Sequence, residues 1–275
     1  MRIDAHQHFW KYNPTSHSWI NDEMSAIRKD FLPEDLLPIL KKNSIDGSIA
    51  VQADETDEET AFLLSLSDQY DFIKGVVGWT DLLSPSGIEE LEKKIRHKKL
   101  IGFRCIMQGQ ADEKYLKNNI FIRNISALAK LDFSYDVLIY HHQLSSVISF
   151  VEQLPDNRLI LDHIGKPAIK EKKYKEWKEN IRVVAQHPGI YCKLSGMITE
   201  ADYTAWSYEE IVPYLDTVAE YFGVDRLCFG SDWPVCLVAG SYDRMIEVIT
   251  RWSKQFNKAD QEKIFGENTS RFYKL

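Results

Sequence analysis

Eight short apolar runs, each rich in residues that favour strands, recur along this sequence of 275 residues. Runs that are short and continuously apolar are typical of strands buried on both faces of a parallel sheet. They lie at residues 1–9, 46–53, 72–81, 100–107, 134–142, 158–163, 189–195 and 226–232. Most of the intervals between them show the spacing of amphipathic helices. Strands that alternate with helices predict an α/β fold with a parallel sheet.

The intervals set the number of strand–helix units. Apolar residues at three- and four-residue spacing predict helices at residues 58–70, 88–97, 121–131, 144–154, 174–186, 243–256 and 258–265, with a further helix beginning near Pro33. Eight such units fit a closed (β/α)8 TIM barrel, for which about 250 residues are typical. An open doubly wound sheet is the alternative. It usually has a glycine-rich turn after its first strand, whereas this sequence has no glycine before Gly47.

No linker rich in serine and glycine divides the chain, so a single TIM-barrel domain over residues 1–275 is predicted. Its distinctive feature is an extended loop after strand 1, at residues 10–32. This loop is long for a strand-to-helix connection, and long loops in compact domains are often binding loops. It carries several rings, at Trp10, Tyr12, His17 and Trp19. The loop is interpreted either as a lid or as packing that plugs the barrel mouth.

Charge and cysteine content exclude several classes of protein. The formal charge of −7 disfavours a nucleic-acid partner, because phosphate binding depends on clustered Lys and Arg. No apolar stretch reaches 18 residues, and the start of the chain lacks the apolar core of a signal peptide, so no membrane association is expected. None of the four cysteines forms a C-x-x-C pair, which predicts buried reduced thiols and a cytoplasmic location.

The first strand ends in the sequence DAHQH, which places two histidines two residues apart. Alternate residues of a strand share a face, so His6 and His8 are expected to point the same way, together with Asp4. In a barrel this face would be the interior near the C-terminal mouth, where active sites lie. Two imidazoles there suit metal ligation or hydrogen bonding to a carbonyl. An H-x-H pair alone is a weak signal, because buried or capping histidines give the same pattern.

Polar residues at the other predicted strand ends strengthen this interpretation. Five of the eight histidines fall at such ends, and three (His17, His97 and His187) are interpreted as structural. The ends of strands four to eight supply Arg104, Tyr140, His141, His142, His163, Lys193, Ser195 and Asp232. Because the C-terminal ends of barrel strands meet at one rim, these side chains predict a single active site.

Three motifs, DAHQH, DHIGKP and GSDWP, occur in an order and spacing that resembles the amidohydrolase superfamily. The likeness is greatest to its branch of TIM-barrel sugar lactonases, such as L-fuconolactonase and L-rhamnonolactonase, which also includes 2-pyrone-4,6-dicarboxylate lactonase. It extends to the early FLPEDLLPIL segment and the final FGENTSRFY, so it covers nearly the whole chain.

The resemblance implies roles for individual residues. Asp232 matches the family's general base, His163 its strand-six histidine, and His6 with His8 its strand-one pair. Arg104 stands where binuclear members carry a bridging lysine or glutamate. A guanidinium cannot ligate a metal, so a binuclear centre is not expected. One zinc on His6, His8 and Asp232, or metal-free catalysis with histidine and Arg104 as direct donors, are both left open.

The expected reaction is the hydrolysis of a lactone, a small-molecule substrate such as L-fucono- or L-rhamnono-lactone. Rings and polar groups near the mouth are candidate substrate contacts: Trp10, Trp79, Tyr140, His142, Lys193 and Trp233. Their alternative is ordinary packing of the barrel mouth. The other functions considered are a metal-dependent decarboxylase of an aromatic acid, a 2-pyrone-4,6-dicarboxylate lactonase, and a catalytically silent sugar-binding barrel. The oligomeric state is left open.

Overall fold

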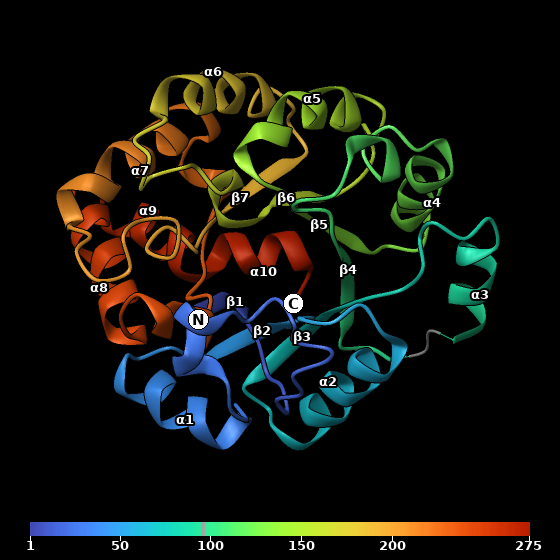
Figure 1. The fold of residues 1–275 in the computed structure, drawn as a ribbon, viewed down its shortest axis with the longest axis horizontal. Coiled ribbons are helices and arrows are strands. Elements are labelled where there is room, and N and C mark those ends of the chain that lie inside the picture. Colours follow the sequence, from blue (N-terminus) through green and yellow to red (C-terminus); the bar gives the residue numbers. More distant parts are fainter. Residues whose placement is uncertain (95–96) are drawn as a thin grey trace.

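Eight parallel strands follow one another around a single sheet in chain order, in a computed structural model that describes residues 1–94 and 97–275 (Figure 1). They are β1 (Ile3–Gln7), β2 (Gly47–Val51), β3 (Ile73–Gly78), β4 (Leu100–Ile106), β5 (Ser134–Leu138), β6 (Leu159–Leu161), β7 (Ile190–Leu194) and β8 (Leu227–Phe229). The first and last strands meet just beyond their ends, where the His8 amide donates to the Trp233 carbonyl at 2.7 Å. The predicted (β/α)8 barrel is confirmed.

Helices surround the strands (Figure 1). They are α1 (Pro33–Lys42), α2 (Asp57–Gln69), α3 (Gly87–Lys94), α4 (Asn119–Lys130), α5 (Leu144–Glu152), α6 (Tyr174–Val184), α7 (Tyr208–Phe222), α8 (Tyr242–Ser253), α9 (Lys258–Glu262) and α10 (Asn268–Tyr273). The sequence-based prediction had no helix where α7 lies. Pro213 interrupts the helical sequence pattern in this segment. In the structure, Ser207 caps the helix, and the buried residues from Ile211 to Phe222 follow helical spacing. The end of the helix predicted at 88–97 includes residues 95–96, which lie outside the described residues.

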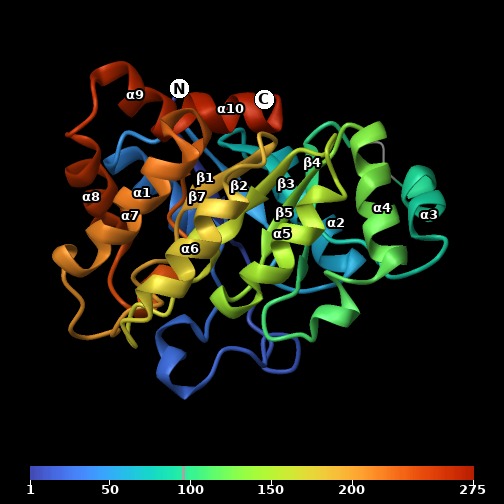
Figure 2. The ribbon, with the colours of Figure 1, turned by 90° about the horizontal axis from the view of Figure 1, so that it is seen from above.

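The two ends of the barrel differ in character. Figure 2 shows α9, α10 and both termini at one end and the loop of residues 10–32 at the other. At the first end, Phe272 and Tyr273 pack with Ile3 and Ala5 of β1, and the Tyr273 hydroxyl donates to Asp136 at 3.0 Å. The α10 side chains therefore fill the barrel from its N-terminal end, which leaves the C-terminal end for a cavity.

The loop of residues 10–32 packs against the segment after β8, where the ring centroids of Phe31 and Trp233 lie 5.2 Å apart. Trp10 and Phe31 pair as a short antiparallel bridge at its base, and a 3₁₀ helix at Asp22–Ile27 forms its tip. Trp10 is buried, and its indole donates to the Lys29 carbonyl at 2.9 Å. The loop is thus a packed wall whose tip reaches over the C-terminal end of the barrel.

Two further predictions concern the chain as a whole. No helix within residues 1–94 and 97–275 is both long and apolar enough to cross a lipid bilayer. All four cysteines are buried free thiols, as predicted, and Cys105, Cys192 and Cys228 lie on β4, β7 and β8.

Candidate active site

The end of β1 departs from simple alternation. The register of β1 against β2 shifts between Asp4 and Gln7. The Asp4 carboxylate turns away from the histidines and accepts hydrogen bonds from the backbone amides of Ser231 (2.9 Å) and His6 (3.1 Å). The prediction that Asp4 shares a face with His6 and His8 is therefore wrong. The irregularity lets Asp4 tie β1 to the segment after β8, while His6 and His8 both face the interior.

Three ligand atoms converge at this point. The Nε2 atoms of His6 and His8 are 3.2 Å apart, and Asp232 Oδ1 lies 3.8 Å and 3.4 Å from them. His8 Nδ1 donates to the Val51 carbonyl at 2.7 Å, which leaves the lone pair of its Nε2 free. Burial lowers the pKa of His6 and of His8, so both rings are neutral near pH 7.

This set of donors fits one zinc ion. Two ligands at about 2.05 Å from zinc and at the tetrahedral angle lie about 3.3 Å apart, and the observed separations are 3.2–3.8 Å. Neutral imidazoles and an ionised carboxylate are the ligands that zinc takes. His6 Nε2 also lies 3.2 Å from Arg104 Nη1, so the guanidinium can donate to this ring in the absence of an ion.

His163 reaches the same carboxylate from an unusual turn. β6 ends at Leu161, so the strand is shorter than predicted, and residues 163–166 all have positive φ. Such angles are unfavourable for residues other than glycine, and strained residues of this kind cluster at active sites. The turn brings His163 Nε2 to 3.9 Å from Asp232 Oδ1 and His163 Nδ1 to 2.9 Å from the Ser195 hydroxyl. Burial lowers the pKa of His163 to about 4.

Replacing Gly196 with alanine tests how tightly the His163 ring is placed. Gly196 has φ +70°, and an added Cβ would lie 2.6 Å from His163 Nδ1. We expect Gly196→Ala to displace the imidazole and to lower kcat about 100-fold, because misplacement by about 1 Å has effects of this size. Gly223→Ala is the matched control: Gly223 has φ +69° with nothing within 4 Å of the added Cβ. Equal activity in the two variants would show that the His163 position does not matter.

Below the imidazoles lies a buried network of charges. Lys193 Nζ contacts Asp136 Oδ2 at 2.5 Å, Asp162 Oδ1 at 3.0 Å and His6 Nδ1 at 3.1 Å. Arg104 Nη1 binds Asp162 Oδ2 at 3.0 Å. Burial alone would raise the pKa of Asp162, but Lys193, His6 and Arg104 hold it well below its usual range. The Lys193 side chain is fully buried, so the structure places it beneath His6 and not at the substrate position that the sequence suggested.

A cavity of about 430 Å³ opens above Asp232 at the C-terminal end of the barrel. Four of the five predicted catalytic residues line it, namely His8, Arg104, His163 and Asp232, and Tyr140 forms part of the wall. His6 lies directly behind His8. Arg104 on β4 and Lys166 in the turn after β6 bring positive charge to this cavity, whereas Asp232 brings negative charge.

The other predicted substrate contacts lie elsewhere. Trp10 and Trp233 are buried and both pack on Phe31, and Trp79 packs against the core. His142 is exposed and stacks on Tyr140, with ring centroids 5.9 Å apart. Alternation along a fifth strand could not place residues 140–142, because β5 ends at Leu138 and a 3₁₀ helix follows at His141–Gln143.

Several further cavity residues come from loops and were not predicted as site residues. They are Trp19, Asn21, Met24, Glu55, Gln108, Gln110, Lys166, Thr199, Glu200 and Tyr203. Two of them had a signal in the sequence: Trp19 is one of the rings of the loop at residues 10–32, and Lys166 belongs to the DHIGKP motif. The Lys166 side chain is only 16% exposed. Loop side chains follow no periodic pattern, so only the folded chain shows which of them meet.

Glu59 on α2 holds the start of the loop that carries Glu55. Its carboxylate accepts hydrogen bonds from the Ala53 amide (3.0 Å) and the Asp54 amide (2.6 Å), and burial raises its pKa from 4.5 to about 7.

This raised pKa predicts a pH dependence of stability. The folded state keeps the Glu59 proton between pH 4.5 and 7, while the unfolded state releases it. The contribution to stability is therefore fully present below pH 4.5 and is lost as the pH rises through 7. Relative to Glu59→Gln, which cannot titrate, the natural protein should lose up to about 3 kcal/mol in its free energy of unfolding between pH 5 and pH 8. Urea denaturation of both proteins measures this. A difference that is the same at both pH values would contradict it.

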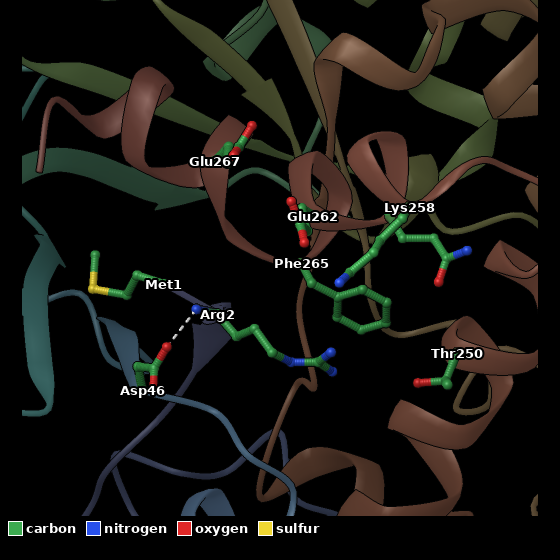
Figure 3. Close-up of a pocket in the computed structure, with 9 residues that line it drawn as sticks. Met1, Arg2, Asp46, Thr250, Lys258, Glu262, Phe265 and Glu267 are labelled. Carbon is green, nitrogen blue, oxygen red and sulfur yellow. Dashed lines mark hydrogen bonds between the residues drawn. The ribbon is translucent and has the colours of Figure 1, made fainter.

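A second hollow, of about 320 Å³, lies at the opposite end of the barrel. Figure 3 shows Arg2 reaching beneath Phe265, with its guanidinium carbon 4.3 Å from the ring centroid, while the Arg2 amide donates to Asp46 at 2.7 Å. Most of its other lining side chains, such as Lys258 and Glu262, are exposed. No metal-ligand cluster found among the described residues lies there. The chemistry therefore belongs to the C-terminal end.

Comparisons with known proteins agree with this geometry. A family model described as amidohydrolase matches residues 3–275. This chain belongs to the amidohydrolase family. An L-fucono-1,5-lactonase of Burkholderia multivorans is 38% identical to this amidohydrolase, over 100% of the chain and 96% of the relative. An L-fucono-1,5-lactonase of Burkholderia ambifaria is 32% identical over the same shares of the two chains.

A solved structure extends the similarity to the tertiary level. The crystal structure of an amidohydrolase from Burkholderia multivorans with bound zinc superimposes with a TM-score of 0.97 at 38% identity, covering 100% of this chain and 99% of that one. The predicted resemblance to the amidohydrolase superfamily is thus confirmed. The zinc belongs to that related protein. In this amidohydrolase, His6, His8 and Asp232 form a buried group whose ligand atoms lie within 4.8 Å of one another.

Proposed function

We propose that this amidohydrolase opens a neutral, sugar-derived lactone by adding water to its carbonyl. The observation that carries the proposal is the convergence of one buried carboxylate, Asp232, with three neutral imidazoles at the floor of a polar cavity. The names of the two Burkholderia relatives support a lactone of the L-fucono-1,5 type.

Asp232 is the group that would accept the proton of the attacking water. Burial opposes its ionisation, but the adjoining imidazoles of His163 and His8 hold its pKa below the ordinary value, so it is ionised at neutral pH. A carboxylate with a low pKa is a weak base toward free water, because a general base works best when its pKa lies near the working pH. Asp232 therefore works best on a water that is already polarised.

Zinc held by His6, His8 and Asp232 would supply that polarisation, since the bound metal lowers the pKa of water to about 7. Arg104 Nη1 lies beside His6 Nε2 and lines the cavity, so it is placed to stabilise the negative charge that develops on the carbonyl oxygen. The Nδ1 atom of His163 pairs with the Ser195 hydroxyl at 2.9 Å, and this contact directs the Nε2 atom of the ring toward Asp232.

The charges of the cavity favour a neutral substrate. Glu55, Glu200 and Asp232 contribute carboxylates, against the cations Arg104 and Lys166. Both of these cations already have a carboxylate partner, in Asp162 and in Glu200. An aromatic acid or a pyrone dicarboxylate would need unpaired cations to bind its carboxylate groups. Both cations among the described residues of this wall are already paired. Carboxylates and amides suit the hydroxyl groups of a sugar, because they accept and donate hydrogen bonds.

A panel of substrates tests the proposal. The purified protein is incubated with L-fucono-1,5-lactone, L-rhamnono-lactone, 2-pyrone-4,6-dicarboxylate and 2,6-dihydroxybenzoate, and acid release is followed with a pH indicator while CO₂ is measured separately. We expect acid release from the aldonolactones. Carbon dioxide from the benzoate would support a decarboxylase instead, and turnover limited to the pyrone would contradict the neutral-substrate argument.

Removal of the metal is expected to abolish most of the activity. The protein should contain about one zinc per chain, and dialysis against a chelator should lower kcat at least 100-fold, with recovery on adding zinc. His8→Ala should lose both the metal and the activity, whereas His17→Ala, outside the cavity, should keep both. Full activity in protein shown by elemental analysis to be metal-free would contradict the zinc assignment and favour direct donation by His6, His8 and Arg104.

A further inference from the structure

Lys166 lines the cavity, and the proposed addition of water to the carbonyl leaves its side chain without a role. It ends the left-handed turn that begins at His163, with φ 44°, and its amide donates to the His163 carbonyl at 2.8 Å. A left-handed conformation costs a residue with a side chain roughly 1 kcal/mol or more. The turn thus fixes the base of Lys166 directly beside a residue that contacts Asp232.

The ammonium group is held within the cavity. Lys166 Nζ lies 3.1 Å from Glu200 Oε1 and 5.6 Å from the centroid of the Tyr140 ring. Glu200 and Asp232 together raise the pKa of Lys166 in spite of its burial, so it carries a proton at neutral pH. An ammonium has three N–H donors, and one carboxylate does not use them all. Lys166 therefore presents a donor to whatever fills the cavity.

Opening a lactone needs such a donor. When the carbonyl carbon loses its bond to the ring oxygen, that oxygen would leave as an alkoxide, whose conjugate acid is about as weak an acid as water. The other positively charged side chain of the wall, Arg104, cannot release a proton. His163 directs its Nδ1 to the Ser195 hydroxyl at 2.9 Å and its Nε2 toward Asp232 at 3.9 Å, so it serves the carboxylate that activates the water.

We propose that Lys166 is the general acid that protonates the ring oxygen of the lactone as the ring opens. This assignment rests on the proposed lactonase function. Water adds its oxygen to the carbonyl carbon, and Asp232 takes the proton that the water releases. The bond from that carbon to the ring oxygen then breaks, its electron pair stays on the oxygen, and Lys166 supplies the proton. The proton on Asp232 leaves to solvent and Lys166 regains one, so the net change is lactone plus water to hydroxy acid.

The test compares two leaving groups. Dihydrocoumarin is a lactone that releases a phenol, with a pKa near the value of about 10 for tyrosine, and it needs little protonation. L-Fucono-1,5-lactone releases an aliphatic alcohol, so its leaving oxygen must be protonated as the ring opens. We expect Lys166→Met to lower kcat on the aldonolactone by about 100-fold or more and on dihydrocoumarin by less than tenfold.

Two further variants separate proton transfer from charge and from folding. Lys166→Arg keeps the positive charge without a transferable proton, and we expect it to be as slow as Lys166→Met on the aldonolactone. Lys170→Met is the matched control, because Lys170 belongs to the same segment but its side chain is 61% exposed. It should leave both activities unchanged. Circular dichroism verifies that each variant folds.

Each contrary outcome has a distinct meaning. Equal losses on the two lactones, or full activity in Lys166→Arg, would overturn the assignment of Lys166 as the acid while leaving the lactonase proposal intact. The assignment of Lys166 would also be overturned if Tyr203→Phe, and not Lys166→Met, lost more activity on the aldonolactone than on dihydrocoumarin. The Tyr203 phenol would then be the acid. If the unsubstituted protein opens neither lactone, the proposed function fails, and the role of Lys166 fails with it.

Discussion

Asp232→Asn is expected to lower kcat for lactone hydrolysis by about 10²- to 10⁴-fold, the usual size of a general-base contribution. Asparagine has nearly the same shape as aspartate, but its amide cannot accept the proton of water. It also offers no negative charge to the imidazoles of His8 and His163, whose Nε2 atoms lie 3.4 Å and 3.9 Å from Asp232 Oδ1. Initial rates of acid release measure the effect.

The control for this substitution is Asp202→Asn. Asp202 lies outside the cavity lining, and an asparagine there can still accept the hydrogen bonds from the Thr204 and Ala205 amides. It should have natural activity. If Asp232→Asn retains more than a tenth of the natural kcat, Asp232 is not the base, and the proton must go to another group of the site.

Lys193→Met is expected to lower the free energy of unfolding by about 3–5 kcal/mol, which is the usual effect of breaking a buried ion pair. Lys193, Asp136 and Asp162 are all fully buried, so loss of the ammonium leaves two carboxylates without their shared partner. Burial already raises the pKa of Asp136 to about 6 even with Lys193 beside it. Urea denaturation at pH 7 measures the change.

A double variant tests whether unpaired charge is the cause. Lys193→Met with Asp136→Asn removes one of the two carboxylates, so part of the lost stability should return. A loss below 1 kcal/mol in Lys193→Met would show that the pair adds little. A loss that the second substitution does not relieve would point to packing of the lysine stem instead.

The barrel and the rim of its active site follow from patterns that are local in sequence. Eight apolar runs and the helices between them predict the (β/α)8 fold, because the strands of such a fold are buried on both faces. His6, His163 and Asp232 come from three distant motifs, yet each lies at or just after the C-terminal end of a strand of the same barrel. Since parallel strands direct their C-terminal ends to one side, the motifs can be placed together without coordinates.

The remaining features depended on contacts between segments far apart in the chain. Asp4 turned away from the histidines because of a register shift, which strand periodicity does not reveal. Trp10 and Trp233 were expected at the substrate, but both are buried and pack on Phe31. An aromatic ring near a barrel mouth can face either the core or the cavity. Only the path of the loop at residues 10–32 decides which of these two orientations occurs.

By itself, the sequence determined the number of strands, their order and the rim at which histidines and carboxylates collect, because hydrophobic periodicity and strand direction are local properties. The tertiary structure decided which of these groups meet. Lys193, expected at the substrate, lies buried beneath His6, and Lys166, which was not predicted as a site residue, lines the cavity beside Glu200. The physical reason is that burial, pairing and the direction of a side chain after a left-handed turn arise from several elements packed together. No single segment carries that information.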